Sequence, residues 1–482
     1  MKNRLAIRLL QIFSVEDLIK FGYFLKMRKA GNAEDKLFEF LKPFHPEFDK
    51  PECNLLEAGK YAFPNSISVG NKKIIDKLSD LAQTIKDYLA VVVLLQDKAE
   101  VRFLTARYFY FKNHHQFFLP ALRESENALY KREERDKWFY LLLYKLSNAR
   151  YFYPLSEHYH KKIAPERFNL MVETLDLFII LSKLEHSIEA THRNKLVSEN
   201  HVISLADAVK SLALKDEFKK ALPNFFLLLL DFHRNESIEK FKELIDNLTE
   251  IIDLISEEEK ANLITWMINE AIFRFNRGDL EYQALAYFLY QMAFGQGYFQ
   301  MQGFMSPGHF TNFFILGTDQ PENSNWLQNL LQQAPTLLPE ERLEETTTIC
   351  QAYLDFASGD FKKVMNSLKK VAHNNVSDTL KIKSLLLRST YELFLVTKNL
   401  QFQEAAITEV ESFRTYLSKQ KQISPVGKAK YENFRKILMK LYRLKGKSNL
   451  PTKKRKLKTE IIMKEDLVCR KWLLDKVELI GQ

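Results

Sequence analysis

The sequence predicts an all-α protein, an α-solenoid of stacked helical hairpins that follows an N-terminal helical cap. Apolar residues recur every three or four positions along most of the chain, as they do on one face of a helix. The 482 residues include only 14 Gly and 14 Pro, too few for the frequent turns of an all-β fold. The composition is 46% hydrophobic and 13% aromatic, which suits a large packed core.

Residues 1–95 are expected to form the cap. The chain opens with MKNRLAIRLLQIFSVEDLIKF, in which Arg8 interrupts the apolar run and after which no small-residue cleavage site follows. We therefore expect the first helix of the fold here, and not a signal peptide. Turn-like stretches then come at irregular intervals, as AGNAED, FHPEFDKPE and AFPNSISVGN. Irregular spacing is typical of a compact cap whose outer face has no neighbour to stack on.

Residues 96–445 are expected to form the solenoid. Between turn signals the apolar spacing is helical, for example over residues 238–255 and 378–396. The signals lie roughly 40 residues apart, which is the length of two helices with their connections. A single helical hairpin cannot bury its apolar face alone, so neighbouring hairpins must stack. The signals fall at Asn113, Tyr153 with Pro154, Arg193 with Asn194, Asn235, Gly278, Gly317, Gly359 and Asn399.

Two of these signals are Gly-Asp pairs that follow aromatic-rich apolar runs. They occur in FRFNRGDLEYQALAYFLYQM, residues 273–292, and in LDFASGDFKKVMNSLKKV, residues 354–371. Neither has the further glycines, or the Lys and Ser or Thr, of a phosphate-binding loop. We expect hairpin corners instead, in which Gly359 ends one helix with positive φ, Asp360 caps the next and Phe361 packs between them. The second stretch resembles a tetratricopeptide repeat, although the longer period makes the array a degenerate one.

Motifs for catalysis and metal binding are absent from the sequence. There is no H-E-x-x-H or G-x-S-x-G motif, and no histidine pair has the i, i+3 or i, i+4 spacing that places two ligands on one helix face. The sequence therefore predicts no enzyme, no cofactor and no metal. An active site assembled from residues that are distant in the sequence stays open as an alternative.

The positive charge of the chain is concentrated near its C-terminus. The formal net charge is +10, but residues 426–458 alone contain 13 Lys or Arg and one Glu, so the rest is close to neutral. Clustered cations attract phosphates, so this block is a candidate anion or nucleic-acid contact, against the alternative of a solvated helix face and linker. An anionic membrane surface or an acidic protein is a further alternative. The candidate contact residues are Lys440, Arg443, Lys453, Lys454, Arg455, Lys456 and Lys458.

Residues 446–482 are expected to be a basic linker followed by a terminal helix. The linker would be the stretch around Pro451, and the helix would dock through Trp472.

An uncharged, aromatic-rich segment interrupts the solenoid at residues 294–310, which read FGQGYFQMQGFMSPGHF. One interpretation is a long loop buried against neighbouring helices. The other is an adaptable apolar surface for a partner, since Met and aromatic side chains make good contact residues. The candidate partner-contact residues are Phe299, Met301, Phe304 and Met305.

Cysteine use and hydropathy predict a reducing, cytoplasmic setting. Cys53, Cys350 and Cys469 lie far apart, so a disulfide framework is not expected. The longest apolar blocks, residues 89–95 and 225–230, fall well short of the roughly 20 residues that a membrane-spanning helix needs.

Several phrases along the chain resemble one family of proteins. They are FSVEDLIKFGYFL, LFEFLKPFHPEFD, LLLRSTYEL, SFRTYLSK, YENFRKILMKLYRLK and KWLLDKV, which together span nearly the whole sequence. They are similar to uncharacterised tetratricopeptide-like helical proteins of about this length from Bacteroidota. Relatives tend to continue the first phrase into a Ser-Pro-Tyr-Phe-Asn-like element, where this chain has KMRKAGN. The resemblance implies the same helical fold, and the family has no established activity to carry over.

These observations favour a scaffold or adaptor that binds another protein or peptide in the concave groove of the solenoid, lined by the first helix of each hairpin. The runner-up is a regulatory or accessory protein that contacts nucleic acid through its basic C-terminal segment.

Overall fold

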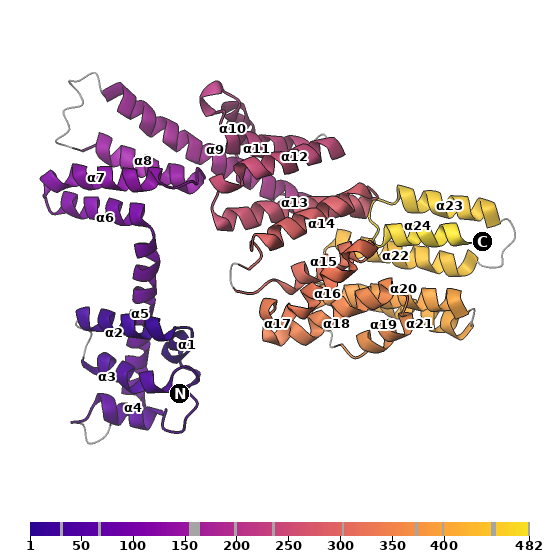
Figure 1. The fold of residues 1–482 in the computed structure, drawn as a ribbon, viewed down its shortest axis with the longest axis horizontal. Helices are drawn as coiled ribbons and strands as arrows, with labels where there is room; N and C mark the ends of the chain where they lie inside the picture. The colour runs from indigo at the N-terminus through magenta and orange to yellow at the C-terminus, as the bar shows by residue number, and fades with distance from the viewer. Residues whose placement is uncertain are drawn as a thin grey trace. The chain divides into compact units, whose positions relative to one another are not determined.

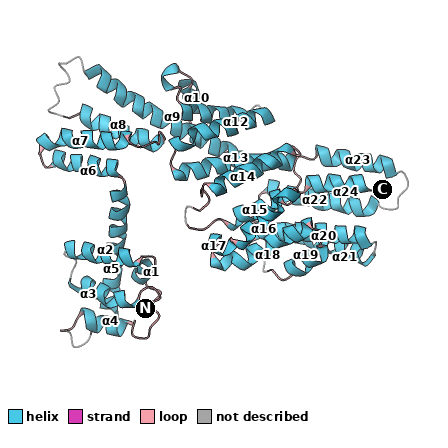
Figure 2. Cartoon of the chain, in the orientation of Figure 1, coloured by secondary structure: helices cyan, strands magenta, loops and turns pink. Residues whose placement is uncertain are grey.

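A computed structural model describes residues 1–28, 32–65, 69–153, 164–196, 200–233, 237–300, 303–371, 375–397, 400–444 and 450–480. Within these ranges the chain consists of helices joined by turns, with no strand (Figures 1 and 2). The predicted all-α class is therefore confirmed for the described residues. Helices that follow each other along the chain pack in pairs, such as α6 with α7, α13 with α14 and α20 with α21.

The chain divides into two compact units. The first contains residues 1–132 and 142–171, and the second contains residues 133–141 and 172–482. Two helices, α8 (Lys137–Tyr151) and α9 (Ala164–Leu196), contribute residues to both.

The first unit begins with two short helices where the sequence predicts one. The first of them ends at Gln11, and Ser14 starts the second, because its hydroxyl accepts a hydrogen bond from the Asp17 amide while the Asp17 carboxylate accepts one from the Ser14 amide. This reciprocal capping box is a strong helix start, and it explains the division. The helices of this unit are α1 (Leu5–Gln11), α2 (Val15–Met27), α3 (Asn32–Leu41), α4 (Leu55–Ala62), α5 (Asn71–Gln96), α6 (Lys98–Phe111) and α7 (His115–Tyr130).

A hydrophobic cluster drawn from residues 6–88 joins α1 to α5. Phe21 lies at its centre, with ring centroids 5.8 Å from Phe13 and 5.0 Å from Phe38. Edge contacts of this kind add to the free energy gained from burial. Further along, α6 and α7 form an antiparallel pair, and the predicted turn at Asn113 lies between them with positive φ.

The second unit contains the remaining helices. They are α10 (Ala206–Ala213), α11 (Ala221–Phe232), α12 (Ile238–Ile251), α13 (Glu257–Arg277), α14 (Glu281–Gly295), α15 (Pro307–Gly317), α16 (Ser324–Gln332), α17 (Ala334–Leu337), α18 (Glu340–Ala357), α19 (Phe361–Leu368), α20 (Val376–Thr397), α21 (Leu400–Lys419), α22 (Pro425–Leu444), α23 (Leu450–Met463) and α24 (Arg470–Leu479).

The turn predicted near Arg193 and Asn194 is displaced along the chain, because α9 continues through both residues and ends at Leu196. Asn side chains are tolerated near helix ends, and the polar run from Thr191 to Asn194 is the last part of this helix and not a corner. The turn predicted at Gly317 is confirmed, since this residue ends α15. The signals at Pro154, Asn235 and Asn399 lie outside the described residues.

Both Gly-Asp pairs lie at corners between two helices, as predicted. Gly359 has φ of 83°, and the carboxylate of Asp360 accepts a hydrogen bond from the Lys363 amide at the start of α19. Phe361 packs back on Phe356 with ring centroids 5.2 Å apart. Gly278 ends α13 with φ of 117°. Here the following residue, Asp279, does not cap the next helix: the N-cap of α14 is Leu280, and α14 starts without a side-chain cap.

The C-terminal helices α20 to α24 share one hydrophobic cluster. Trp472, the predicted anchor of the last helix, donates a hydrogen bond of 2.7 Å from its indole Nε1 to Glu392 of α20. Arg470 is 3% exposed and donates to backbone carbonyl oxygens at the end of α23 and to Asn276 beside the Gly278 corner. The side chain of Arg470 therefore fastens the end of α13 to the C-terminal helices.

Candidate functional site

The basic block is built on α22, whose two faces differ sharply. Its apolar side chains Phe434, Ile437, Leu438 and Leu441 are buried in the C-terminal cluster. Its solvent face carries cations at helical spacing, as Lys436, Lys440 and Arg443. The helix therefore holds these three charges on one side, with their backbone positions fixed by the packed opposite side.

The predicted linker is wrong over residues 450–463, which form α23. Pro451 lies in the first turn of this helix, where its missing amide proton costs nothing. Leu457 and Ile461, four residues apart, are buried against the other C-terminal helices and hold α23 in place. In the sequence, these two apolar residues are hard to recognise as one helix face, because cations surround Leu457 from Lys453 to Lys458.

Several of the predicted contact residues are engaged within the chain. Lys440 donates to both carboxylate oxygens of Glu460 on α23, each at 2.6 Å. Lys458 and Lys454 both contact the Glu478 carboxylate on α24, at 2.5 and 3.4 Å. The hydrogen bond from Lys458, followed by its positive charge, lowers the pKa of Glu478 below its usual value. Lys453 also has an interaction within the chain.

Other cations keep their charge available to a ligand. Within the part of the chain that the structure describes, the side chains of Arg443, Arg455 and Lys456 make no ion pair or hydrogen bond, and the same holds for Lys436 and Lys464. Arg443, Lys456 and Lys436 are exposed. These side chains can therefore contact an anion without first losing a partner.

Two adjoining hollows lie along the line where α22 faces α23, and we call them together the α22–α23 groove. The first has a volume of about 270 Å³ and the second of about 280 Å³. They share Lys440, Arg443 and Glu460. The remaining lining residues are Glu411, Asn433, Arg435, Lys436, Ile437, Met439 and Lys464 in the first hollow, and Leu444, Lys453, Lys456 and Leu457 in the second.

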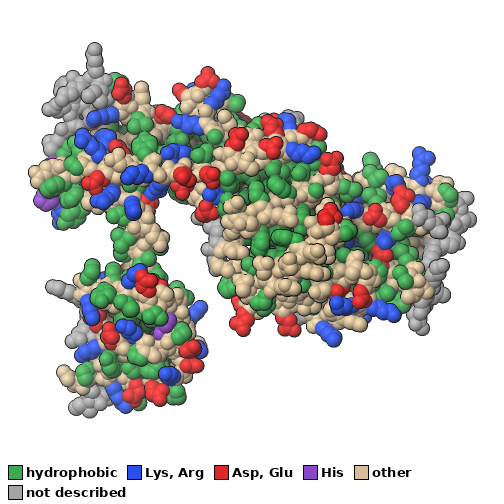
Figure 3. Space-filling model, viewed as in Figure 1, with side chains coloured by type: hydrophobic (Ala, Val, Ile, Leu, Met, Phe, Trp, Pro, Cys, Tyr) green, Lys and Arg blue, Asp and Glu red, His purple; other side chains and the backbone are tan. Residues whose placement is uncertain are grey.

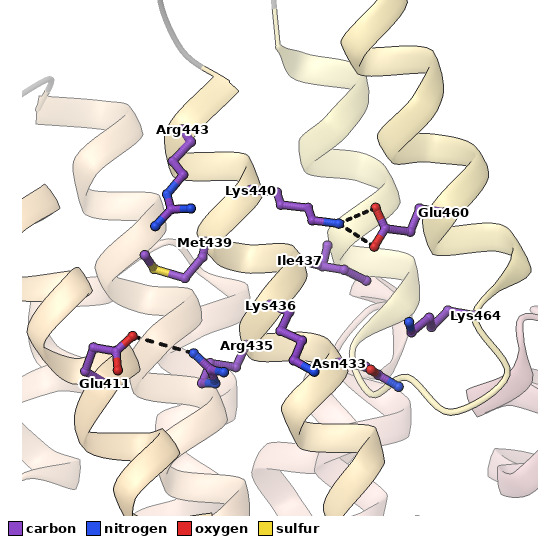
Figure 4. A pocket seen from close by; sticks show the side chains of 10 residues that line it. All are labelled: Glu411, Asn433, Arg435, Lys436, Ile437, Met439, Lys440, Arg443, Glu460 and Lys464. Atoms are coloured by element: carbon purple, nitrogen blue, oxygen red, sulfur yellow. Dashed lines mark hydrogen bonds and ion pairs between the residues drawn. The ribbon is translucent and has the colours of Figure 1, made fainter.

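Figure 4 shows how the first hollow is arranged. Lys440 extends from α22 across to Glu460, and Arg435 points the other way toward Glu411 of α21 at 3.6 Å. Arg435 also pairs with Glu432 one turn earlier on its own helix, at 3.1 Å. The hollow has five cationic side chains and two carboxylates, so its net charge is positive. Apolar side chains, among them Met439 and Leu457, line the two hollows between the charges.

The groove also contains residues outside the candidate set predicted from the sequence. Lys436 belongs to the same face of α22 as Lys440, four residues away, and helical spacing alone could have identified it. Lys464 directly follows α23 and Glu411 belongs to α21, so only the packing of three helices brings them to the groove.

The candidate partner-contact loop between α14 and α15 has its residues in different environments. Phe299 stacks on His309 with ring centroids 4.6 Å apart, and burial lowers the pKa of that histidine. Met305 is 1% exposed, and its amide donates to the Leu337 carbonyl at 2.6 Å. Phe304 is 51% exposed, and Met301 lies outside the described residues. Of the three described candidates, Phe304 alone presents most of its side chain to solvent.

Comparison of this chain with protein-family models, with curated proteins and with solved structures finds no match. Among the described residues, no group of three His, Cys, Asp or Glu side chains is placed to hold a metal ion. No described helix combines the length and the apolar character needed to cross a membrane.

Proposed function

We propose that this protein is a helical binding protein, without catalytic activity, that holds an acidic segment of another protein or peptide in the α22–α23 groove. The observation that carries the proposal is a pair of exposed cations, Arg443 and Lys456, that have no ion-pair partner among the described residues and lie beside the apolar side chains of Leu444 and Leu457. Charged walls next to apolar lining residues fit a segment in which acidic and apolar side chains alternate.

A peptide fits this groove better than nucleic acid does. Each hollow has a volume of about 270 to 280 Å³, enough for a few side chains and far less than a duplex needs. Single strands usually stack their bases on aromatic side chains, and none of the described residues that line the two hollows is aromatic. Contact with nucleic acid through the same cations is the alternative function.

The wider arrangement expected from the sequence belongs to the same proposal. Hairpin corners at Gly278 and Gly359 support a stack of helical hairpins, and such stacks generally use an extended concave face to bind peptides. A cytoplasmic location and membership of the Bacteroidota family are likewise part of the proposal.

Binding can be tested with two labelled probes of matched negative charge, a short peptide of alternating Glu and Leu and an oligothymidine. We expect fluorescence anisotropy to show saturable binding of the peptide to the full chain, and the double variant R443E/K456E to weaken it at least roughly tenfold. The matched control is K369E/K370E, which makes the same charge change at exposed residues after α19 and should bind as the unaltered chain does.

The salt dependence separates the two classes of ligand. Contacts with phosphates weaken steeply as salt rises, whereas the apolar part of a peptide contact persists. Preferential binding of the oligothymidine, lost in R443E/K456E and at high salt, would replace the peptide proposal by the nucleic-acid one. Equal loss of peptide binding in the control variant would mean that only the overall charge matters.

A further inference from the structure

Helix α2, in the first unit, has apolar side chains on both of its faces. Leu18, Phe21 and Leu25 are buried in the N-terminal cluster. The opposite face is also apolar, and its side chains remain in contact with solvent. The exposed fractions are 69% for Ile12, just before the helix, and 69% for Val15, 47% for Ile19, 65% for Tyr23 and 82% for Met27. We call these five residues the α2 stripe.

A surface helix with one buried face normally has a polar opposite face. Exposed apolar residues are unremarkable when they are scattered, but a contiguous group of them marks an interaction surface. From Val15 to Met27 the stripe follows the four-residue spacing of one helix face, so these four members adjoin one another. Figure 3 shows hydrophobic side chains exposed among charged ones on the part of the surface that α1 to α5 form.

Two charges lie within the angular range of the stripe, one toward each end of the helix. At 100° per residue, Glu16 projects between Tyr23 and Met27, and Lys26 projects between Val15 and Ile19. Both side chains are exposed. Glu16 contacts Lys20 at 2.7 Å, but this ion pair is exposed and contributes little to stability.

The positions of these residues are symmetric about Phe21. Val15 and Met27 lie six residues on either side of it, Glu16 and Lys26 five residues, and Ile19 and Tyr23 two residues. A two-fold axis that lies in the contact plane opposite Phe21, perpendicular to the helix, would bring Ile19 against Tyr23 of a second, antiparallel α2 helix and place Glu16 level with Lys26 of that helix. Val15 and Met27 would lie at the two edges of the contact, beside these charges. One register brings the central apolar contact and both charge pairs within reach at once.

We propose that two copies of this chain associate through antiparallel packing of their α2 stripes about this axis. The occupant is a second copy because the stripe is complementary to itself, in charge as well as in apolar position. A contact of essentially one helix per subunit is small, so we expect a reversible dimer with a Kd on the order of micromolar. The proposal uses none of the residues of the α22–α23 groove, so either proposal can fail without the other.

The test is sedimentation equilibrium of the full chain over a range of concentrations, with charge-reversed variants. The unaltered chain should dimerise, while E16K alone and K26E alone should each associate at least roughly tenfold more weakly, because each places like charges together at two symmetric points. An equimolar mixture of E16K and K26E should recover the dimer, since each contact then joins a Lys to a Glu. Y23K should be monomeric with its thermal unfolding unchanged, because this side chain is 65% exposed.

Matched controls are E52K and K72E, which reverse exposed charges of the first unit away from α2 and should dimerise normally. Circular dichroism of every variant checks that the helices remain folded. A chain that stays monomeric at all concentrations would overturn the proposal. A dimer that is indifferent to E16K and K26E, or a mixture no stronger than its components, would equally overturn it, and would assign the stripe to a different partner.

Discussion

Burial, together with the negative charge of Asp136, raises the pKa of the Glu259 carboxyl from 4.5 to about 7. Glu259 lies in the first turn of α13, where it contacts Lys137 at 3.2 Å. Lys137 also pairs with Glu185 of α9, so two carboxylates depend on one ammonium group. The cation lowers the pKa of Glu259, but burial and the neighbouring carboxylates outweigh it.

This residue should make the stability of the fold depend on pH. The folded chain binds the Glu259 proton more tightly than the unfolded chain does, so the free energy of unfolding falls as pH rises from 4.5 to about 7 and its contribution is constant above that. We expect E259Q to remove this pH dependence and to raise the free energy of unfolding at pH 8 by about 1–3 kcal/mol.

Urea unfolding of E259Q and of the unaltered chain across this pH range measures the effect. The control is E257Q, which changes an exposed glutamate two residues away and should keep the original profile. An E259Q profile parallel to that of the unaltered chain would contradict the prediction.

At the scale of the elements, the two Gly-Asp corners differ in what surrounds the glycine. A Cβ at Gly359 would meet nothing within 4 Å, so only its φ of 83° demands glycine. At Gly278 a Cβ would also lie 3.2 Å from Cδ of Arg470. Since Arg470 is fixed by several carbonyl oxygens, it has little freedom to move aside. The two corners look alike in the sequence but tolerate change differently.

We therefore expect G359A to lower the free energy of unfolding by about 1 kcal/mol, because alanine adopts positive φ only with strain. G278A should cost more, since the strain at φ of 117° adds to the crowding against Arg470. G295A is the control, because this residue ends α14 without positive φ and with open space around it, and there alanine should be neutral or slightly stabilising.

Chemical denaturation of the three variants gives the comparison. Equal losses for G359A and G278A would show that Arg470 yields freely. If G295A lowered the free energy of unfolding as much as G359A does, positive φ could not be the cause of the loss at Gly359.

The sequence was informative where a local rule acts alone. Gly359 and Asp360 predict their corner because positive φ and helix capping depend on a few adjacent residues. Ser14 and Asp17 form an equally local signal that the single predicted N-terminal helix overlooked. In contrast, the Thr191–Asn194 run is polar enough for a turn, yet it continues α9 because local propensity is only a weak constraint.

At the scale of the whole molecule, contacts divide the chain into two units, each with its own buried core residues. Phe21, fully buried, belongs to the cluster of the first unit, and Leu441, 2% exposed, belongs to the C-terminal cluster of the second. Units with separate cores can unfold separately when few contacts join them.

We expect differential scanning calorimetry to show two unfolding transitions. Replacing Phe21 by Ala should lower the midpoint of one of them, and replacing Leu441 by Ala should lower the other, because each deletion costs about 2–5 kcal/mol in its own core. A single transition that both substitutions shift alike would mean that the chain unfolds as one cooperative body.

Of the features described above, the groove was the least predictable from the sequence. The charge count located its cations, since thirteen basic residues in one stretch are visible without a fold. It could not tell that Lys440, Lys454 and Lys458 are paired with Glu460 and Glu478, because these partners are 20 to 24 residues away along the chain. Which cations stay available depends on how α22, α23 and α24 pack together.

Glu460 has a further consequence for any acidic ligand of the groove. Its carboxylate already occupies the ammonium group of Lys440, and because it is attached to α23 it acts as a tethered competitor with a fixed effective concentration. A ligand with a single carboxylate gains little by displacing it. Under the proposed function, the groove would thus respond to the number of charges that a ligand presents together, and would ignore the abundant small acids around it.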